Sequence, residues 1–336
     1  MSLGVQRIAN AMDDALKEWL WDGPFTHLQT RIRQFVHYCA GLVPLSHRVL
    51  RRHVLARVHE LMKGELGRRW TRDRNVRRVI RVYGQDDQRT AAWHSKRGQM
   101  ITASELGAIF TGGETRRSVM VRKLEPPAPS TGPPCAPLIW GTRFEPVAKK
   151  IYEEETSCSI TDVSCVQHPI HSFLGASPDG IVFPTNEESR STRYGRLVEF
   201  KCPFSRVAKD GVPAAYIHQM QMQMECTGID ECEYVEFRFK QVFYAEWVAF
   251  QGRKGIFAIF EDDTVSYIKD ASWTEREHQK VYWILQSVKK DFVPKDPNWL
   301  PSHFDDLKAF WDEVVQHRTN GTKPASPPST TVTIDL

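Results

Sequence analysis

An amphipathic helical pattern followed by a series of short apolar runs constrains the fold of this chain more than any other feature. The pattern WGTRFEPVAKKIYEEE spaces its apolar residues three and four apart, which predicts a helix over residues 140–155. The runs FLGA, GIVF, RLVEFKC, YVEFRF and WVAF are short and have the composition of β-strands. A last helix is predicted over 274–292, where Thr274 and Glu277 fit a capping box. This order of elements predicts a single α/β domain over residues 86–315.

Three other segments lie outside this pattern or interrupt it. The stretch LSHRVLRRHVLARVHELMKGEL has helical spacing with Ser46 as a candidate N-cap, so residues 1–85 are predicted to form a helical N-terminal extension. The stretch EPPAPSTGPPCAPL has six prolines in 14 residues, which predicts a loop over 125–138. Residues 316–336 have few apolar side chains, and we expect a disordered tail.

The composition excludes several classes of protein. The apolar and charged fractions are those of an ordinary globular protein. No apolar run approaches the roughly 18 residues that a membrane span needs, and the opening MSLGVQRIANAMDD lacks the apolar core of a signal peptide. The seven cysteines follow no disulfide framework and fit reduced thiols. We therefore expect an intracellular protein that is neither secreted nor bound to a membrane.

The positive charge of the chain is concentrated near its N-terminus. Residues 1–84 hold 16 Lys or Arg and seven Asp or Glu, a net charge of +9, whereas the whole chain carries +4. Most of this excess lies between Arg48 and Arg81. A basic block of this kind suits the phosphates of a nucleic acid. It is also typical of a solvated helical surface, so both interpretations stay open at this point.

Two acids and a lysine stand out in the predicted strands. Asp179 lies in SPDG between two apolar runs, a sequence typical of a turn. In RLVEFKC the side chains alternate, so Glu199 and Lys201 share one face of a strand. Two carboxylates beside a lysine fit a hydrolytic site for phosphodiesters, because oxygen ligands bind Mg²⁺ and an ammonium group can orient a water. The alternative is a turn aspartate with an unrelated surface Glu–Lys pair.

Four segments in a fixed order give this pattern a family resemblance. They are AAWHSKRGQMITASELGAIF (91–110), IWGTRFEPVAKKIYEEETS (139–157), SPDGIV with LVEFKCPFS, and YIHQMQMQMECTG (216–228). Together they resemble the PD-(D/E)xK nucleases, in particular the branch of phage lambda exonuclease, YqaJ-type viral recombinases and the alkaline nucleases of large DNA viruses. The resemblance implies a restriction-endonuclease-like α/β core, in which helices flank a central mixed β-sheet.

The resemblance also implies roles for individual residues. Asp179, Glu199 and the backbone carbonyl of Phe200 would bind the metal, and Lys201 would position the attacking water. Glu145, in the W-G-x3-E helix, would be a further catalytic and metal-binding acid. Arg97 and Ser104 would bind a DNA 5′-phosphate, and Gln219 and Gln221 would line the site, with Gln221 favoured. Arg116 and Arg117 match no family motif and are only weak candidates for further DNA contacts.

Two features of the sequence limit these assignments. Some relatives carry a further acid about ten residues before the aspartate, but residues 164–176 contain none, so binding of a second metal stays open. Four potential zinc ligands are closely spaced, yet their pattern matches no standard zinc finger, and buried cysteines and loop histidines are the alternative; they are Cys158, Cys165, His168 and His171.

The expected function follows from the resemblance. It is a Mg²⁺-dependent exonuclease, with Mn²⁺ as a substitute, that degrades duplex DNA ends 5′ to 3′ for viral recombination. The alternatives are an alkaline-nuclease-like enzyme with endo- and exonuclease activity on DNA or also RNA, and a DNA-end-binding protein without catalysis. The expected partners are DNA ends and a single-strand annealing protein. Relatives include both trimers and monomers, and a viral source implies the nucleus or cytoplasm of the host.

Overall fold

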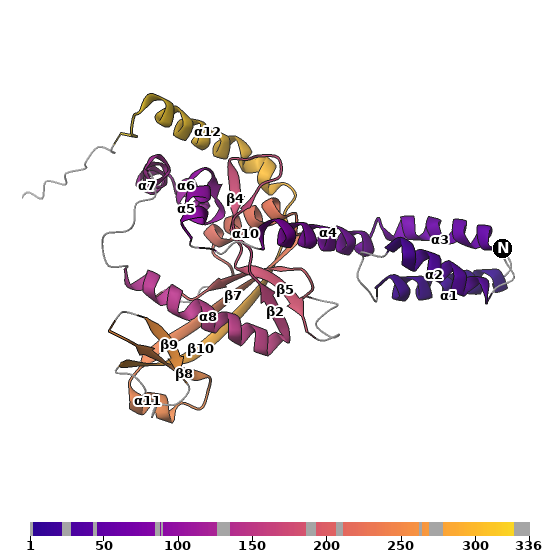
Figure 1. The fold of residues 1–336 in the computed structure, drawn as a ribbon, viewed down its shortest axis with the longest axis horizontal. Coiled ribbons are helices and arrows are strands. Elements are labelled where there is room, and N and C mark those ends of the chain that lie inside the picture. The colour runs from indigo at the N-terminus through magenta and orange to yellow at the C-terminus, as the bar shows by residue number, and fades with distance from the viewer. Residues whose placement is uncertain are drawn as a thin grey trace, which may run out of the picture. The chain divides into compact units, whose positions relative to one another are not determined.

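The chain forms two compact units in the computed structural model, Met1–Arg78 and Val79–Leu336. The structure describes residues 3–21, 28–42, 46–84, 88, 90–125, 135–185, 193–205, 211–261, 264–268 and 278–325. Figure 1 shows the helices of the first unit and the sheet of the second. Within the described residues, no helix has both the length and the apolar content that crossing a bilayer requires.

The first unit is helical, as its sequence pattern predicts. It contains α1 (Leu3–Trp21), α2 (Leu28–Ala40), α3 (His47–Leu61) and the first part of α4 (Glu65–Tyr83). The Ser46 hydroxyl accepts a hydrogen bond from the Val49 amide at 3.4 Å and caps α3. The side chains of α3 that repeat at helical spacing are buried against α1 and α2, among them Leu50, Val54 and Val58.

A mixed sheet forms the centre of the second unit. Its strands follow the order β2-β5-β6-β7-β10-β8-β9. Their bounds are Cys158–Thr161, Gly180–Pro184, Leu197–Lys201, Glu231–Val242, Gln279–Pro294, Lys254–Ile259 and Val265–Ile268 in that order. β6 and β7 run parallel, and the other neighbours are antiparallel. The pairing of β5 with β6 places Gly180, the first residue of β5, beside Val198, the residue before Glu199.

Helices cover both faces of this sheet (Figure 1). α8 (Ala136–Thr156) packs on one face, where Phe144, Ala148 and Tyr152 meet the apolar side chains of β6 and β7. α10 (Ala214–Thr227) lies on the other face, toward which Glu199 of β6 points. Alternation along β6 therefore separates the apolar core from a polar face.

A smaller sheet and several helices complete the unit. The sheet has the order β1-β4-β3. The remaining elements are β1 (Ile101–Thr102), β3 (Val166–Gln167), β4 (Leu174–Ala176), α5 (Ala91–Gly98), η2 (Ala103–Glu105), α6 (Leu106–Thr111), α7 (Gly113–Leu124), α11 (Tyr244–Ala249) and α12 (Trp299–Asn320). The predicted class is confirmed: the second unit is α/β with a central mixed sheet flanked by helices, and a helical region precedes it.

The predicted helix over 274–292 is wrong. Residues Gln279–Pro294 form β10, which pairs with both β7 and β8, while Thr274 and Glu277 lie outside the described residues. The segment is rich in valine and aromatic side chains, and two neighbouring strands satisfy its backbone, so tertiary pairing outweighs the helical spacing. The run WVAF is also misassigned, because Trp247–Ala249 belong to α11 rather than to a strand.

Two predicted boundaries shift as well. α8 begins at Ala136, within the predicted loop 125–138, because proline is tolerated in the first helical turn and Pro137 lies there. Residues 126–134 lie outside the described residues. α12 continues to Asn320 and ends at Gly321 in a left-handed conformation, so the helix extends past residue 315 into the predicted tail.

Candidate active site

Glu199 is a fully buried acid on the polar face of the main sheet. It lies on β6 with no exposed surface. Its Oε1 accepts hydrogen bonds from the Lys201 ammonium and, at 2.6 Å, from the Gln219 amide. Its Oε2 accepts one from the Gln223 amide, also at 2.6 Å. Such donors stabilise a buried carboxylate in its ionised form, in which it accepts hydrogen bonds only.

Asp179 lies beside this carboxylate because β5 and β6 pair at this point. The chain bends at Asp179, and the strand begins at the next residue. Its Oδ2 accepts a hydrogen bond from the Phe200 amide at 2.7 Å. Burial and then the charge of Glu199 raise the pKa of Asp179 well above its ordinary value, although Lys201 acts in the opposite direction. Asp179 and Glu199 are thus brought together as predicted.

Lys201 is the cation of this group. Its ammonium contacts Glu199 and lies 4.7 Å from the centre of the Tyr216 ring. Burial alone lowers the pKa of Lys201, but the charges of Glu199 and Asp179 outweigh burial and hold the pKa above its ordinary value. Lys201 is therefore a charged donor rather than a neutral base in this arrangement.

Glu145 reaches the same region from α8. It is partly buried, and its charge contributes to the raised pKa of both Asp179 and Cys202. Among the described residues, however, no three His, Cys, Asp or Glu side chains form a group that could hold a metal ion. Glu145 thus acts on Asp179 through its charge, and its role as a third metal ligand stays a prediction.

The residues at this point fit a divalent cation. The charge of Glu199 contributes to the raised pKa of Asp179, and a bound cation would oppose that effect. The Gln223 Oε1 atom is buried near Glu199 without a hydrogen-bond partner among the described atoms. Asp179 and Glu199 would supply oxygen ligands, and hard cations prefer such ligands. The Phe200 carbonyl as a further ligand stays a prediction.

The glutamines of α10 are arranged differently from the prediction. Gln219 binds Glu199, as its place in the site requires. Gln221 instead donates to the Pro294 carbonyl and accepts from the Asp296 amide, both at 2.9 Å, so the preference for Gln221 is wrong. Successive residues of a helix are 100° apart, so residues four apart share a face and residues two apart do not. The missed residue is Gln223, and its spacing from Gln219 was the available signal.

Arg97 and Ser104 form a second polar group. The Arg97 guanidinium donates to the hydroxyls of Ser104 at 2.9 Å and of Thr102 at 3.1 Å, and lies over the Trp93 ring at 4.3 Å. It also reaches the Ser177 hydroxyl at 3.5 Å, two residues before Asp179. Burial lowers the pKa of Arg97. The structure therefore brings this predicted phosphate-binding pair next to the segment that carries Asp179.

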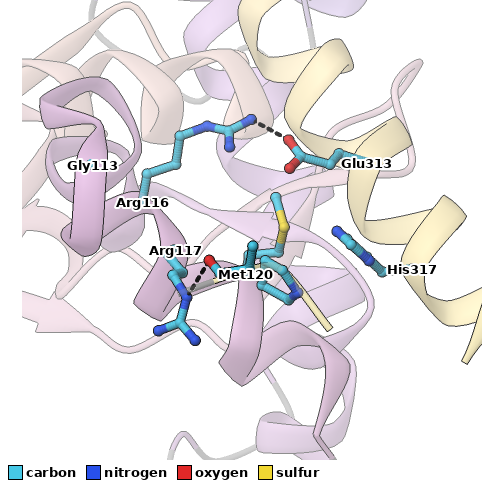
Figure 2. A pocket seen from close by; sticks show the side chains of 8 residues that line it. Gly113, Arg116, Arg117, Met120, Glu313 and His317 are labelled. Carbon is cyan, nitrogen blue, oxygen red and sulfur yellow. Dashed lines mark hydrogen bonds and ion pairs between the residues drawn. The ribbon is translucent and has the colours of Figure 1, made fainter. Parts of the chain in front are cut away.

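Arg116 and Arg117 take part in contacts within the protein. Arg116 pairs with Glu313 at 2.6 Å, and Arg117 pairs with Glu114 at 3.0 Å and donates to the Ala325 carbonyl at 2.9 Å. These residues line a cavity of about 290 Å³ between α7 and the end of α12 (Figure 2). Asp179, Glu199 and Lys201 are not among the described residues that line this cavity. The weak DNA contacts assigned to both arginines stay predictions.

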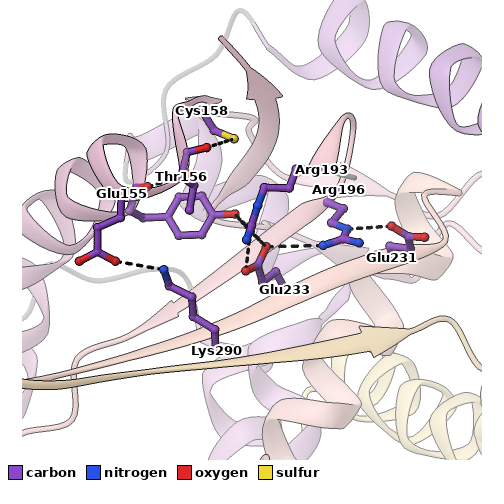
Figure 3. Close-up of polar contacts among 9 residues, drawn as sticks. Glu155, Thr156, Cys158, Arg193, Arg196, Glu231, Glu233 and Lys290 are labelled. Carbon is purple, nitrogen blue, oxygen red and sulfur yellow. Dashed lines mark hydrogen bonds and ion pairs between the residues drawn. The ribbon is translucent and has the colours of Figure 1, made fainter. Parts of the chain in front are cut away.

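A network around the buried Glu233 holds Arg193 and Arg196, which precede β6. Glu233 of β7 accepts hydrogen bonds from Arg193 at 2.6 and 2.7 Å and from the Tyr152 hydroxyl at 2.9 Å (Figure 3). Arg196 pairs with Glu231 at 2.8 Å. Burial and then the charge of Glu233 raise the pKa of Tyr152. The residues before β6 are thus tied to β7 and α8.

The four potential zinc ligands have other partners. Cys158 donates to the Thr156 carbonyl at 3.3 Å, and Cys165 contacts the Met100 sulfur at 3.8 Å. His168 Nδ1 accepts hydrogen bonds from two backbone amides of its own loop, and burial lowers its pKa to about 4. The His171 ring stacks on that of His168, with 4.9 Å between the ring centres. Buried thiols and loop histidines account for these residues.

One family model matches the chain. Residues 92–230 match the YqaJ-like viral recombinase domain. An uncharacterised protein of Acanthamoeba polyphaga mimivirus is 27% identical over 183 residues, which cover 51% of this chain and 32% of that protein. A protein of African swine fever virus is 26% identical over 155 residues, which cover 40% of this chain and 44% of its own length. The matched regions thus span less than half of either viral relative.

The solved structures that resemble the chain include two exonucleases. An alkaline exonuclease from Laribacter hongkongensis covers 69% of this chain and 95% of its own, with 22% identity and a TM-score of 0.44. A phage-related exonuclease from Haemophilus somnus covers 66% of this chain and 96% of its own, with 12% identity and a TM-score of 0.42.

Proposed function

We propose that the chain is a metal-dependent deoxyribonuclease acting on DNA ends, in keeping with the match of residues 92–230 to the YqaJ-like viral recombinase domain, the family that the motifs predict. The observation that carries the proposal is the group formed by Asp179, Glu199 and Lys201. The buried Glu199 carboxylate, the half-buried Asp179 carboxylate and a charged lysine lie together on β6 and at the start of its neighbour β5. An arrangement of this kind suits hydrolysis of a phosphodiester.

Asp179 and Glu199 would hold a divalent cation, with Mg²⁺ as the physiological ion and Mn²⁺ as a substitute. Bound there, such an ion lowers the pKa of a water and offsets the charge of the scissile phosphate. The Phe200 amide keeps the Asp179 carboxylate in place. Lys201 orients the attacking water or the phosphate through its ammonium group, and Glu145 adds negative charge at the rim of the site.

The preference for DNA ends is proposed from Arg97 and Ser104. A terminal 5′-phosphate would bind between the guanidinium and the hydroxyl, and this contact would fix the register of the strand at its end. Ser177 links this pair to the bend at Asp179, so the phosphate and the scissile bond would be held by one continuous segment. The resulting polarity is 5′ to 3′, which leaves single strands for a recombination partner that anneals them.

The test compares linear and closed DNA. The protein should degrade an end-labelled linear duplex in Mg²⁺ and leave a covalently closed circle of the same sequence intact. A duplex without 5′-phosphate should be degraded more slowly, and Arg97→Gln should remove this difference. Lys201→Ala should abolish cleavage of every substrate while DNA binding persists. Equal cleavage of circle and linear duplex would contradict the end-specific proposal, and full activity of Lys201→Ala would contradict the assignment of the site.

A further inference from the structure

Two amide groups of α10 contact the Glu199 carboxylate, one on each of its oxygens. The Gln219 amide donates to Oε1 and the Gln223 amide donates to Oε2, each at 2.6 Å. The two glutamines are four residues apart and therefore lie on one face of the helix. Neither is more than slightly exposed, and Gln223 is fully buried.

Packing alone does not explain a glutamine at position 223. Its neighbours Met220, Met222 and Met224 are equally buried, so α10 fills this depth with methionine elsewhere. The Gln223 amide oxygen has no hydrogen-bond partner among the described atoms, and an unsatisfied buried acceptor costs free energy. Turning the amide over would bring that oxygen against the Glu199 Oε2 atom. The side chain therefore keeps an unsatisfied oxygen in order to donate to Glu199.

The two oxygens of the Glu199 carboxylate accept different numbers of hydrogen bonds. Oε1 receives both the Lys201 ammonium and the Gln219 amide, which uses its two acceptor positions. Oε2 receives the Gln223 amide among the described groups, so one acceptor position is left on that atom. Loss of the Gln223 amide would free the carboxylate to rotate and would change which position is open.

We propose that Gln223 is a positioning residue of the active site. By holding Oε2 of Glu199, it presents the remaining acceptor position of that carboxylate to a divalent cation. The inference rests on the proposed function, since it concerns the carboxylate that would bind the metal. It predicts that Gln223 controls metal affinity although it is not itself a ligand. Groups that orient metal ligands commonly contribute about 10- to 100-fold to affinity or activity.

The test measures Mn²⁺ binding to the full chain without DNA, by isothermal titration calorimetry. Gln223→Met gives position 223 the side chain of its neighbours and should weaken Mn²⁺ binding about tenfold or more. Gln223→Met also leaves the buried Glu199 Oε2 atom without this donor, so its melting temperature should fall, and Mn²⁺ binding is measured well below that temperature. Gln223→Glu, which keeps the side-chain length but replaces the donor with an acceptor, should also weaken Mn²⁺ binding.

Gln221→Met is the matched control on the same helix. It removes two hydrogen bonds to the Pro294 and Asp296 backbone, so it should lower the melting temperature and leave Mn²⁺ binding unchanged. Wild-type affinity in both Gln223 variants would overturn the inference while leaving the proposed nuclease intact. Equal weakening in Gln221→Met would overturn it too, because the effect would then follow the helix. A wild-type chain that binds no Mn²⁺ would overturn the proposed function itself.

Discussion

The residues around Lys201 keep its side chain charged, and Tyr216 is one of these residues. The ammonium lies 4.7 Å from the Tyr216 ring centre, and that ring stacks on Tyr234 at 5.8 Å. The Tyr234 hydroxyl in turn donates to buried Glu236 at 2.6 Å. Two stacked aromatic rings therefore support Lys201 beside the acids. A cation over an aromatic face is stabilised by about 0.5–2 kcal/mol.

Two substitutions of Tyr216 distinguish the contribution of its ring from that of its hydroxyl. Tyr216→Leu removes the face that attracts the ammonium, and we expect the rate of the chemical step to fall about 2- to 30-fold. Tyr216→Phe keeps the face and should stay within about threefold of the wild type. Single-turnover cleavage at saturating metal measures both. Equal losses in the two variants would assign the effect to the hydroxyl instead.

His168 makes stability depend on pH. Its folded pKa of about 4 lies below the ordinary value of 6.5, because burial disfavours the charged ring. Between these values the unfolded chain binds a proton that the folded chain does not, so stability should fall as the pH drops from 6.5 to 4. His168→Asn keeps an acceptor for the Ile170 and His171 amides but does not titrate. Urea unfolding at neutral and mildly acidic pH should show a smaller loss for His168→Asn, and an identical loss would exclude His168 as the cause.

At the scale of the element, the packing of β5 against β2 explains why position 180 is a glycine. The sequence SPDG suggests a glycine chosen for positive φ, but Gly180 is not among the described glycines with that conformation. A Cβ added at Gly180 would lie 2.1 Å from the Ile160 Cγ2 atom and 3.1 Å from the Thr161 carbonyl oxygen. Gly180 is therefore needed so that β5 can approach β2 directly after Asp179.

Gly180→Ala should displace the start of β5 together with Asp179. We expect a loss of about 1–3 kcal/mol in the free energy of unfolding, as for other overpacked cores, and a weaker metal site. Ile160→Leu removes the methyl group that the new Cβ would meet and keeps the side-chain volume. The double variant should recover part of both losses, measured by denaturant unfolding and Mn²⁺ titration. If the losses of the two single variants simply add in the double variant, contact with Ile160 is not the source of the strain.

At the scale of the whole molecule, two units with different charge share one chain. The division after Arg78 falls within α4, and the Tyr83 carbonyl accepts a hydrogen bond from the Ser164 amide at 2.8 Å in the second unit. Removing all of residues 1–84 would therefore also remove contacts of the second unit. Neutralising exposed arginines in the full chain tests the N-terminal charge without this disturbance.

Arg48, Arg51 and Arg52 are exposed on α3. If the first unit binds DNA phosphates, replacing all three by Gln should weaken binding and make the affinity less dependent on salt. The slope of log affinity against log salt should decrease by up to about one for each phosphate that the variant no longer neutralises. Lys308→Gln is the control, since that ammonium pairs with Asp312 on the surface of α12. Fluorescence anisotropy at several salt concentrations measures the slope, and an unchanged slope in the triple variant would favour a structural role for the basic unit.

The sequence by itself determined the residue types of the site and most of the elements that carry them. The order of the motifs and their resemblance to a nuclease family predicted Asp179, Glu199 and Lys201 as site residues. Strand alternation, a local property of the chain, placed the last two on one face. The tertiary structure decided what depends on contacts between distant segments. The orientation of α10 against β6 selected Gln219 and Gln223 and excluded Gln221, and pairing with two strands made Gln279–Pro294 a strand. Such choices depend on partners far away in sequence, whose positions no local pattern encodes.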